Sequence, residues 1–440
     1  LRHTQHTVDP PGTLALARTR PGHFLLGCAG FDSSHQTPRT CRHSHLPVEC
    51  IGGRIWTSTQ WPNMPLDLGA TWIHGTQGNP LTALADRINA KRFVTDSESE
   101  ITYGLQGQVL SNAQTKQLDQ VTQLINKRLE AVQDDEELES DISVRRAIMP
   151  LLNGLDANSD MARLIHFILN SNLEQEYGGS IDQLSAQYFD ESKELPGGDK
   201  FFAQGFQVIT QHLAEGLNIK LSHIIKAIDY SGSQVAITTS RGVIMADQVI
   251  VTLPLGVLKS GQIKFKPVLP DNKQKIIGKM QMGVLNKCFL RFEKAFWPTD
   301  VDWLEVIPAQ HGHWAEWISF MRAAKWPVLL GFNAADRGRE IERMSDADIV
   351  QDAMKTLKNI YGNNIPKPID FQITRWAQDP FSLGSYSFNQ VGYKPNQRDI
   401  LAAPVKGKVF FAGEATHKDY YGTAHGAYMS GLRAAREVAG

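Results

Sequence analysis

The feature that most restricts the fold of this chain is a short unit near its carboxyl end. Residues 407–412 are apolar and favour a buried strand, Gly413 and Glu414 follow as a turn, and a helix is expected from His425 to Val438. A helix start so close to a strand end presents unpaired N–H groups and a positive dipole end, which suit an anionic or electron-rich ligand. On these residues alone, a plain strand-turn-helix unit with a surface glutamate is an equally good interpretation.

Length and charge narrow the class of protein. At 440 residues the chain is too long for one simple core. We therefore expect two domains, whose segments can be interleaved along the chain. The 45 basic and 46 acidic side chains nearly cancel, which favours neither nucleic acid nor a membrane surface as a partner. No stretch approaches the roughly 18 apolar residues that a membrane helix needs.

The four cysteines are sparse, and their spacing matches no metal site. They are Cys28, Cys41, Cys50 and Cys288. We therefore expect no metal and no disulfide scaffold, and a cytoplasmic location. The sequence shows no secretory signal and no peroxisomal address.

Hydrophobic periodicity and turn residues predict an α/β fold. Residues 88–140 are polar and helix-rich, and we interpret the acidic run at 134–137 as a solvated face. Residues 201–217 are expected to form one amphipathic helix, and 346–361 another. Short strands are expected at 219–221, 224–230, 234–239, 242–246 and 248–253, as in a β-meander, and at 282–292.

Three separated segments resemble the flavin-containing amine oxidases, and among them the polyamine oxidases and the related histone lysine demethylases. They are 68–75 (LGATWIHG), 252–259 (TLPLGVLK) and 410–435 (FFAGEATHKDYYGTAHGAYMSGLRAA). The resemblance implies an α/β fold with a discontinuous Rossmann-like FAD-binding domain and an α+β substrate-binding domain. The first would comprise 1–80, 200–265 and 405–440, and the second 81–199 and 266–404.

The same resemblance assigns a set of residues to FAD. They are Glu49, Gly52, Gly53, Arg54, Gly69, Ala70, Thr71, Trp72, Ile225, Thr252, Trp376, Gly413, Glu414, Thr423 and Ala424. A glycine pair has no Cβ to obstruct the pyrophosphate, although by itself it would indicate a generic turn. Glu414 matches the acid of the ribityl-phosphate region, and Ala424 the N–H that reaches the flavin pyrimidine oxygen. The carboxyl-terminal flavin region has no cysteine, so noncovalent FAD is expected.

The resemblance also implies catalytic and substrate-binding residues. Lys287 matches the family lysine that holds a water against flavin N5, with a surface-edge lysine as the alternative; a lone lysine buried in an apolar strand would be costly unless paired or hydrated. Tyr386 and Thr423 match two opposite walls of the substrate site. Trp376 and Phe381 either line the same cavity or are ordinary core aromatics.

His74 and Glu176 complete the predicted substrate site. His74 lies where animal spermine and acetylpolyamine oxidases carry histidine and plant polyamine oxidases tend to carry glutamate. A neutral histidine can hydrogen-bond to a substrate amine near neutral pH, and a structural histidine is the alternative. Glu176 loosely matches a carboxylate that contacts a distal substrate nitrogen, and a solvated glutamate is the alternative.

The first fifty residues depart from the family pattern. A strand, G-x-G-x-x-G and a helix are needed at this point to hold the pyrophosphate. Here only Gly27 is in place, since Ala29 and Asp32 occupy the other glycine positions, although Glu49 has close to the spacing of the ribose-binding acid. A frame-shifted or misassembled start is our hypothesis. If the sequence is genuine, FAD should bind weakly.

The implied reaction is the oxidation of a polyamine by FAD and oxygen to an aldehyde, a shorter amine and hydrogen peroxide. One alternative is oxidation of another amine: a monoamine, an amino acid or a peptide lysine. The chain has no long helical insertion and no chromatin module, which disfavours the demethylase interpretation. The other alternative is a flavin-free scaffold or pseudo-oxidase, which the unusual amino terminus favours.

Overall fold

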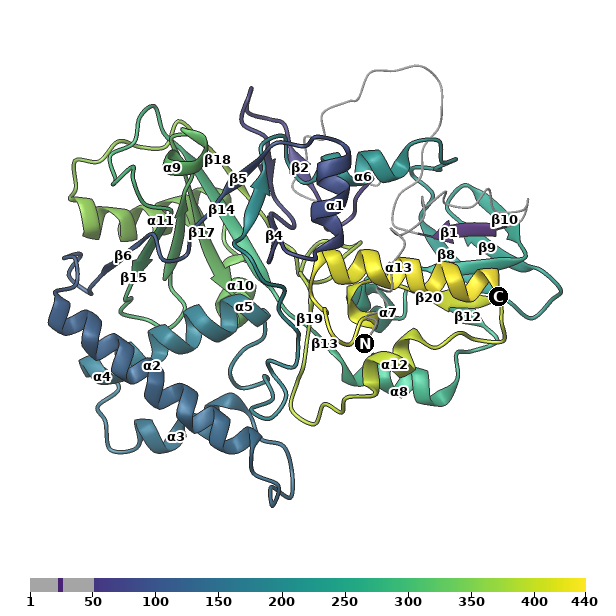
Figure 1. Cartoon of the computed structure of the whole chain (residues 1–440), viewed down its shortest axis with the longest axis horizontal. Coiled ribbons are helices and arrows are strands. Elements are labelled where there is room, and N and C mark those ends of the chain that lie inside the picture. Colours follow the sequence, from purple (N-terminus) through teal and green to yellow (C-terminus); the bar gives the residue numbers. More distant parts are fainter. Residues whose placement is uncertain (1–22, 27–50) are drawn as a thin grey trace, which may run out of the picture.

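The expected carboxyl-terminal unit is present in the computed structural model, which describes residues 23–26 and 51–440 (Figure 1). β1 (His23–Leu26), β11 (Gln248–Val251) and β20 (Val409–Phe411) form a parallel sheet in that order. After the η2 turn (Glu414–Thr416), α13 (Ala424–Ala439) packs against β11 and β20. The predicted strand, turn and helix are therefore confirmed.

The expected meander is confirmed for three strands, β8 (Ile225–Asp229), β9 (Val235–Thr239) and β10 (Gly242–Ala246). β12 (Lys264–Lys266) joins them in parallel to β8. The strand expected at 248–253 forms as β11, but it leaves the meander for the parallel sheet. The strand expected at 219–221 is wrong: residues 219 and 220 have no regular structure, and a turn follows at 221–222, where His223 Nδ1 and the carbonyl of Leu221 hydrogen-bond.

The largest sheet has six strands in the order β18-β14-β17-β16-β15-β6. Neighbours are antiparallel except β15 and β6. One face packs on α11 (Asp346–Tyr361), whose predicted bounds are confirmed. The strands are β6 (Glu100–Tyr103), β14 (Leu285–Arg291), β15 (Trp303–Val306), β16 (Glu316–Ser319), β17 (Val328–Ala334) and β18 (Asp370–Ile373).

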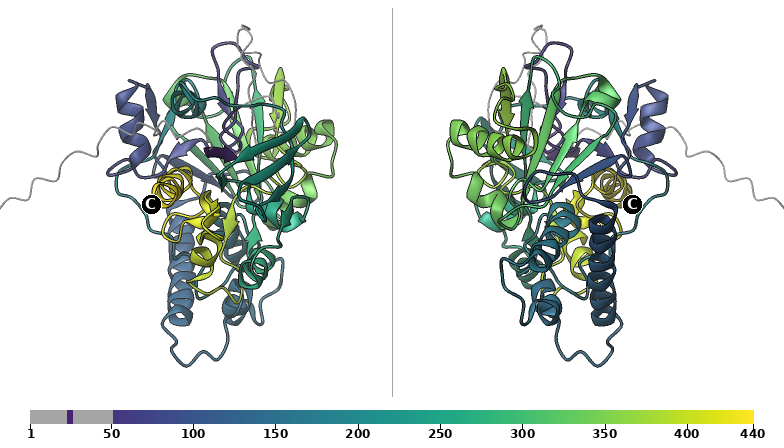
Figure 2. Two further views of the ribbon diagram at one scale, coloured as in Figure 1. Left: turned by 90° about the vertical axis from the view of Figure 1, so that its right-hand side faces the viewer. Right: turned by 90° about the vertical axis from the view of Figure 1, so that its left-hand side faces the viewer.

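A group of helices with its own apolar core lies beneath this sheet (Figure 2). It comprises α2 (Asn112–Gln133), α3 (Val144–Leu152), α4 (Asp160–Ile168), the π-helix η1 (Leu169–Glu174) and α5 (Gln175–Tyr177). The acidic run at 134–137 follows α2 and is exposed, as expected. In the part of the chain that the structure describes, no helix has the length and apolar character to cross a bilayer.

Short elements connect these layers. They are β2 (Thr57–Ser58), β3 (Leu66–Asp67), β4 (Trp72–Ile73), α1 (Pro80–Arg87), β5 (Arg92–Val94), β7 (Lys200–Phe202), α6 (Gln207–Ala214), α7 (Leu255–Ser260), α8 (Asp271–Lys279), β13 (Gln281–Met282), α9 (Met321–Ala324), α10 (Ala335–Ile341), β19 (Ser387–Phe388) and α12 (Gln397–Ala402).

Two of these elements correct sequence expectations. The single helix expected at 201–217 is wrong, because Phe201 and Phe202 are buried in β7 between β4 and β5, and α6 begins only after Gly205 with its φ of 81°. The strand expected at 282–292 is interrupted at Gly283. A Cβ there would lie 2.7 Å from the carbonyl carbon of Gly178, so the backbones can meet only at glycine.

The predicted domain bounds place α8 and α12 in the substrate domain, but both helices pack elsewhere. Ile277 of α8 and Leu401 of α12 lie in the apolar core that also contains Val249 and Phe411. We therefore propose that the cofactor-side domain also includes these two helices, and that the division otherwise follows the predicted segments.

Lys273 is a buried cation that joins these two helices. Its ammonium donates hydrogen bonds to the carbonyls of Ile400 (2.8 Å) and Leu401 (2.7 Å). Burial, followed by the positive charge of Arg433, lowers the pKa of Lys273 to about 7. An unfolded lysine has a pKa of about 10.4. Between about pH 7 and this value, the unfolded state therefore keeps a proton that the folded state has released. Stability contributed by this group therefore increases from pH 7 upwards, by at most about 1.4 kcal/mol per pH unit.

We predict that Lys273→Met removes this pH dependence. The free energy of unfolding, measured with denaturant at pH 7, 8 and 9, should rise less steeply with pH in the variant than in the unmodified protein. Lys275→Met changes an exposed lysine of the same helix and should keep the original slope. Identical slopes in all three proteins would contradict the assignment.

Candidate functional site

The ammonium of Lys287 fastens a glycine-containing segment to the large sheet. From β14, Nζ donates hydrogen bonds to the carbonyls of Asp67 (2.9 Å) and Gly69 (2.6 Å) and to Oγ1 of Thr71. The residue is 5% exposed, so the alternative of a surface-edge lysine is wrong. Three acceptors match the three hydrogens of an ammonium. A water beside Lys287 stays a prediction, and it would have to share one of these hydrogens.

Burial has opposite effects on Lys287 and on the carboxyl group of Asp67. It lowers the pKa of Lys287, and the negative charge of Asp67 opposes that shift. It raises the pKa of Asp67, against hydrogen bonds from the Thr57 hydroxyl and the Phe206 N–H and against the charge of Lys287. The opposite charges of the two groups therefore reduce both shifts beneath the glycine segment.

Glu414 connects the two ends of the described chain. Oε1 accepts a hydrogen bond from Arg54 (2.8 Å), and Oε2 accepts from the hydroxyl of Ser387 (2.6 Å) and the N–H of Gly422 (2.9 Å). Burial tends to raise the pKa of Glu414, but Arg54 and Ser387 outweigh it and the pKa is lowered. Both oxygens thus have protein partners. The predicted contact with the ribityl-phosphate region stays a prediction.

The backbone around Gly53 and Gly413 suits the close approach of a cofactor. Both residues have positive φ, 58° and 117°, and a Cβ built on either would meet no atom within 4 Å. Gly52, in contrast, is packed, since its Cβ would lie 2.3 Å from the carbonyl oxygen of Ile55. Open backbone of this kind and a helix start fit a phosphate-bearing ligand.

The other predicted cofactor residues lie near the carboxyl ends of the parallel strands or beside Lys287, except that Ile225 is at the start of β8 in the meander. Thr252 directly follows β11, Ile225 is buried in β8, and Ala424 is the first residue of α13. Ligands of such sheets bind at these strand ends. Ala70 donates its N–H to the carbonyl of Arg54 (3.0 Å), which joins the two glycine segments. Glu49, Gly27, Ala29 and Asp32 lie outside the described residues.

Aromatic rings surround Lys287. Its ammonium lies 5.6 Å from the ring centroid of Trp72. That ring is stacked with Trp303 at 6.4 Å between centroids and lies 6.4 Å from Phe332. Trp376 is buried against Trp56 at 6.4 Å, which favours the core alternative for this residue, and Phe381 packs beside the same apolar cluster.

Tyr386 and Thr423 are both held by the backbone. The hydroxyl of Tyr386 donates to the carbonyl of Gln175 (2.9 Å), and burial raises its pKa well above the usual value, as do the charges of Glu176 and Glu316. The hydroxyl of Thr423 donates to the carbonyl of Tyr420 (2.8 Å) and accepts from the N–H of Gly426 (3.0 Å). Thr423 therefore caps α13, and its predicted role as a substrate wall stays a prediction.

His74 forms a hydrogen-bonded pair with Asp199. Nδ1 lies 2.7 Å from Oδ2 of Asp199, whose other oxygen accepts the N–H of Gly75 (2.9 Å). Burial, the largest influence, lowers the pKa of His74, but Asp199 and the charge of Glu176 outweigh it and the pKa is raised. The side chain is nevertheless 57% exposed.

Glu176 is exposed at the end of α5, as its alternative interpretation states, but its charge acts on His74, Tyr386 and Glu316.

The sequence analysis missed the buried Glu174, which accepts hydrogen bonds from His311 (2.6 Å) and Asn170 (2.8 Å). It also missed Asp67 and Asp199. Only Asp67 carried a signal, since it directly precedes the 68–75 motif.

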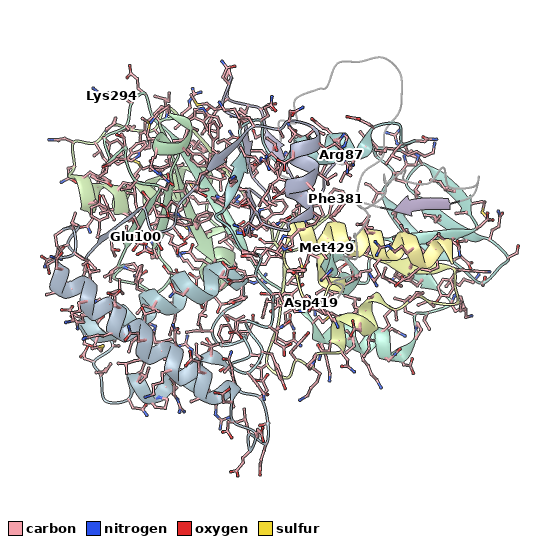
Figure 3. The ribbon with its side chains drawn as sticks, viewed as in Figure 1. Arg87, Glu100, Lys294, Phe381, Asp419 and Met429 are labelled. Atoms are coloured by element: carbon pink, nitrogen blue, oxygen red, sulfur yellow. The ribbon has the colours of Figure 1, made fainter. Side chains whose placement is uncertain are left out.

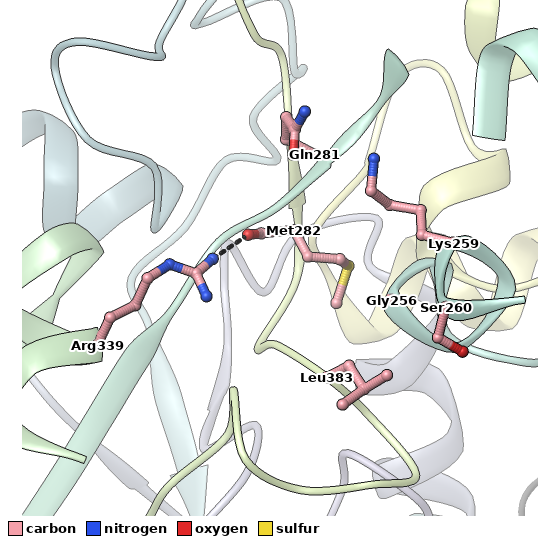
Figure 4. A pocket seen from close by; sticks show the side chains of 7 residues that line it. All are labelled: Gly256, Lys259, Ser260, Gln281, Met282, Arg339 and Leu383. Carbon is pink, nitrogen blue, oxygen red and sulfur yellow. Dashed lines mark hydrogen bonds between the residues drawn. The ribbon is translucent and has the colours of Figure 1, made fainter. Parts of the chain in front are cut away.

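A separate recess of about 290 Å³ lies beside α7 and β13 (Figure 4). Arg339 donates to the carbonyl of Met282 (2.8 Å) there, and Lys259 to the carbonyls of Gly278 (2.7 Å) and Met280. Both cations are therefore satisfied by backbone. No residue predicted for catalysis lines this recess, and we assign it no function.

Comparison with known proteins decides the family. The family model for flavin containing amine oxidoreductases matches residues 48–439. This chain belongs to that family. Polyamine oxidase 2 of Arabidopsis thaliana is 33% identical over 402 residues, which cover 88% of this chain and 81% of that protein. Human lysine-specific histone demethylase 2 is 29% identical over 407 residues, 88% of this chain but 49% of the relative.

A solved structure of putrescine oxidase bound to putrescine has the same fold, with a TM-score of 0.72 at 16% identity over 88% of this chain and 91% of that one. The predicted family and its α/β, two-domain amine-oxidase fold are thus confirmed. The cofactor of the family is FAD, bound noncovalently. The open glycine backbone, the start of α13 and the strand ends described above fit that cofactor.

We predict that Asp199→Asn lowers the pKa of His74, because it removes the charge that raises it. The ring titration of His74, followed by NMR, should shift to lower pH. If neutral His74 is needed for amine oxidation, the acidic limb of the kcat/KM profile should shift in the same direction. Asp182→Asn, which removes an exposed carboxylate paired with Arg145, should change neither. An unchanged titration of His74 in the Asp199 variant would contradict the assignment.

Proposed function

We propose that this amine oxidase oxidises polyamines such as spermine, spermidine or their acetylated forms to an aldehyde and a shorter amine, with production of hydrogen peroxide. The observation that carries the proposal is the convergence of three distant segments: Lys287 and His74 lie beside the Trp72 ring, and the charge of Glu176 acts on both His74 and Tyr386. The similarity to plant polyamine oxidases supports it. Bound FAD would supply the hydride acceptor and the route of the electrons to oxygen.

His74 is suited to adjust the protonation of the substrate amine. A carbon next to nitrogen can lose hydride only when the nitrogen lone pair is available, so the amine must be neutral. With Nδ1 facing the carboxylate of Asp199, the ring keeps Nε2 as its proton acceptor. His74 can therefore take a proton from an incoming ammonium, and Asp199 stabilises the resulting charge.

Lys287 holds the segment on which FAD would rest. Its three hydrogen bonds order the carbonyls of Asp67 and Gly69 and the hydroxyl of Thr71. Because its pKa is lowered, its proton is also more readily given up than that of an exposed lysine. Both properties suit a group that assists flavin reoxidation or imine hydrolysis through water.

Two further points belong to the proposal. Oxidation of a peptide lysine is the second candidate, because histone demethylases are among the relatives. A cytoplasmic location, and molecular oxygen and a polyamine as the only partners, with no nucleic acid, remain predictions.

Purified protein should be yellow with oxidised FAD, and a peroxide-coupled screen should respond to polyamines more strongly than to monoamines or a methylated lysine peptide. FAD retained through gel filtration measures how firmly the cofactor is held, which the sequence of residues 1–50 predicts to be weak. A colourless protein that gains no activity with added FAD would indicate the flavin-free scaffold instead.

We predict that Lys287→Met slows flavin turnover strongly, because both the hydrogen bonds to the glycine segment and the titratable group are lost. Stopped-flow absorbance separates the reductive from the oxidative half-reaction. Lys367→Met, which alters an exposed lysine, is the control and should behave as the unmodified protein. Near-normal rates in both half-reactions of the Lys287 variant would refute the role.

A further inference from the structure

A row of side chains crosses one face of the large sheet, beginning at Lys287. Lys287 lies opposite Phe332 of β17, and Glu316 of β16 lies opposite Glu305 of β15. Trp317 of β16 lies opposite Gly331 of β17, and continuing this register by one residue places Glu316 opposite Phe332. Residues directly opposite one another project from the same face of a sheet. Lys287, Phe332, Glu316 and Glu305 therefore form one line, which we call the carboxylate row.

The spacing of strands sets the length of the carboxylate row. Neighbouring strands lie about 4.8 Å apart, so Glu316 starts roughly 10 Å and Glu305 roughly 14 Å from the strand of Lys287. Beyond them, the hydroxyl of Thr102 on the edge strand β6 donates to Oε2 of Glu305 (3.0 Å). Glu100, on the same edge strand, is exposed at the outer side of the sheet (Figure 3).

The carboxylate row faces the predicted active site. The charge of Glu316 acts on the hydroxyl of Tyr386, and the charge of Glu176 acts on both Glu316 and Tyr386. Glu176 also acts on His74. These groups come from four separate parts of the chain, so the row and the predicted catalytic residues share one region.

The two carboxylates of the row have no cationic partner among the described residues. Burial is the largest influence on both, and it raises the pKa of Glu305 to about 7 and that of Glu316 well above its usual value. The charge of a neighbouring glutamate adds to the shift in each case. Like charges directly opposite each other destabilise a sheet. The arrangement thus costs folding stability unless a cation is supplied.

Ser171 of η1 brings a buried hydroxyl beside Glu316. The residue is 6% exposed, and the interaction of its hydroxyl with the Glu316 carboxyl group opposes the rise in the pKa of that group. A carboxylate has about four lone-pair positions, so Glu316 can also accept a ligand N–H at this point.

Aromatic surface lies between and beside these polar groups. Phe332 separates Lys287 from Glu316 in the row, and Trp303 lies on the same face two residues before Glu305. Both rings adjoin Trp72. Apolar surface alternating with carboxylates matches a ligand in which methylene chains alternate with ammonium groups.

We propose that Glu316 and Glu305 bind the distal ammonium groups of a linear polyamine that lies along the carboxylate row, with its reacting carbon at the Lys287 end. The inference rests on the proposed function and narrows it to long substrates. A diamine is too short to reach Glu305, whereas a tetraamine spans the row. Affinity should therefore increase from putrescine to spermidine to spermine.

The test compares Glu316→Gln and Glu305→Gln with the unmodified protein. Isothermal titration calorimetry should show spermine binding weakened about tenfold or more in each variant, as expected for loss of a hydrogen bond to a charged group. Butylamine, which has no distal nitrogen, should be affected much less. In turnover, the change should fall on KM more than on kcat. Glu130→Gln, an exposed glutamate of α2, is the matched control and should bind spermine normally.

Both variants should also be at least as stable to heat at pH 8 as the unmodified protein, because they remove unpaired buried charge, and this excludes misfolding as the cause of weaker binding. Unchanged spermine binding, or equal losses of affinity for spermine and butylamine, would contradict the proposed binding role of the carboxylate row. A lysine peptide that depends on Glu316 when spermine does not would also overturn it. If no amine is oxidised but spermine binding still requires both carboxylates, the row stands and the proposed oxidase function fails.

Discussion

The buried carboxylate of Glu414 is the interaction on which the cofactor side of this protein depends. It accepts hydrogen bonds from Arg54, Ser387 and Gly422, which belong to segments at opposite ends of the described chain. A carboxylate buried without such donors would be strongly unfavourable. The glycine pair, β19 and the turn before α13 therefore have to assemble together, and their assembly creates the backbone surface that fits FAD.

On the substrate side of the protein, buried charged groups occur in two different situations. The charge of Lys287 is fully satisfied by the Asp67–Thr71 segment, so it acts as a rigid connection between sheet and cofactor region. Glu316 and Glu305, on the same face of the same sheet, have no cation beside them in the described structure. A satisfied buried charge orders the fold, whereas an unsatisfied one has binding capacity left for a ligand.

Local patterns predicted the elements whose signals are local. The bounds of α11 and the strands of the meander follow from periodicity and turn residues, and α13 begins one residue before its expected start. The errors arose where a distant contact decided the outcome. Phe201 and Phe202 have helical spacing with their neighbours but are held as a strand by β4 and β5, and Gly283 breaks a strand because Gly178 lies against it.

The sequence by itself determined the family and the noncovalent FAD, because glycine turns, a helix start and a strand end are encoded by neighbouring residues. The residues assigned to FAD stay a prediction. Only the tertiary structure decided that Asp199 pairs with His74, that α8 and α12 pack into the same apolar core as β11 and β20, and that Glu316 and Glu305 continue the row of Lys287. The reason is that strand register and long-range pairing depend on how whole elements pack, and no local pattern specifies which strands become neighbours.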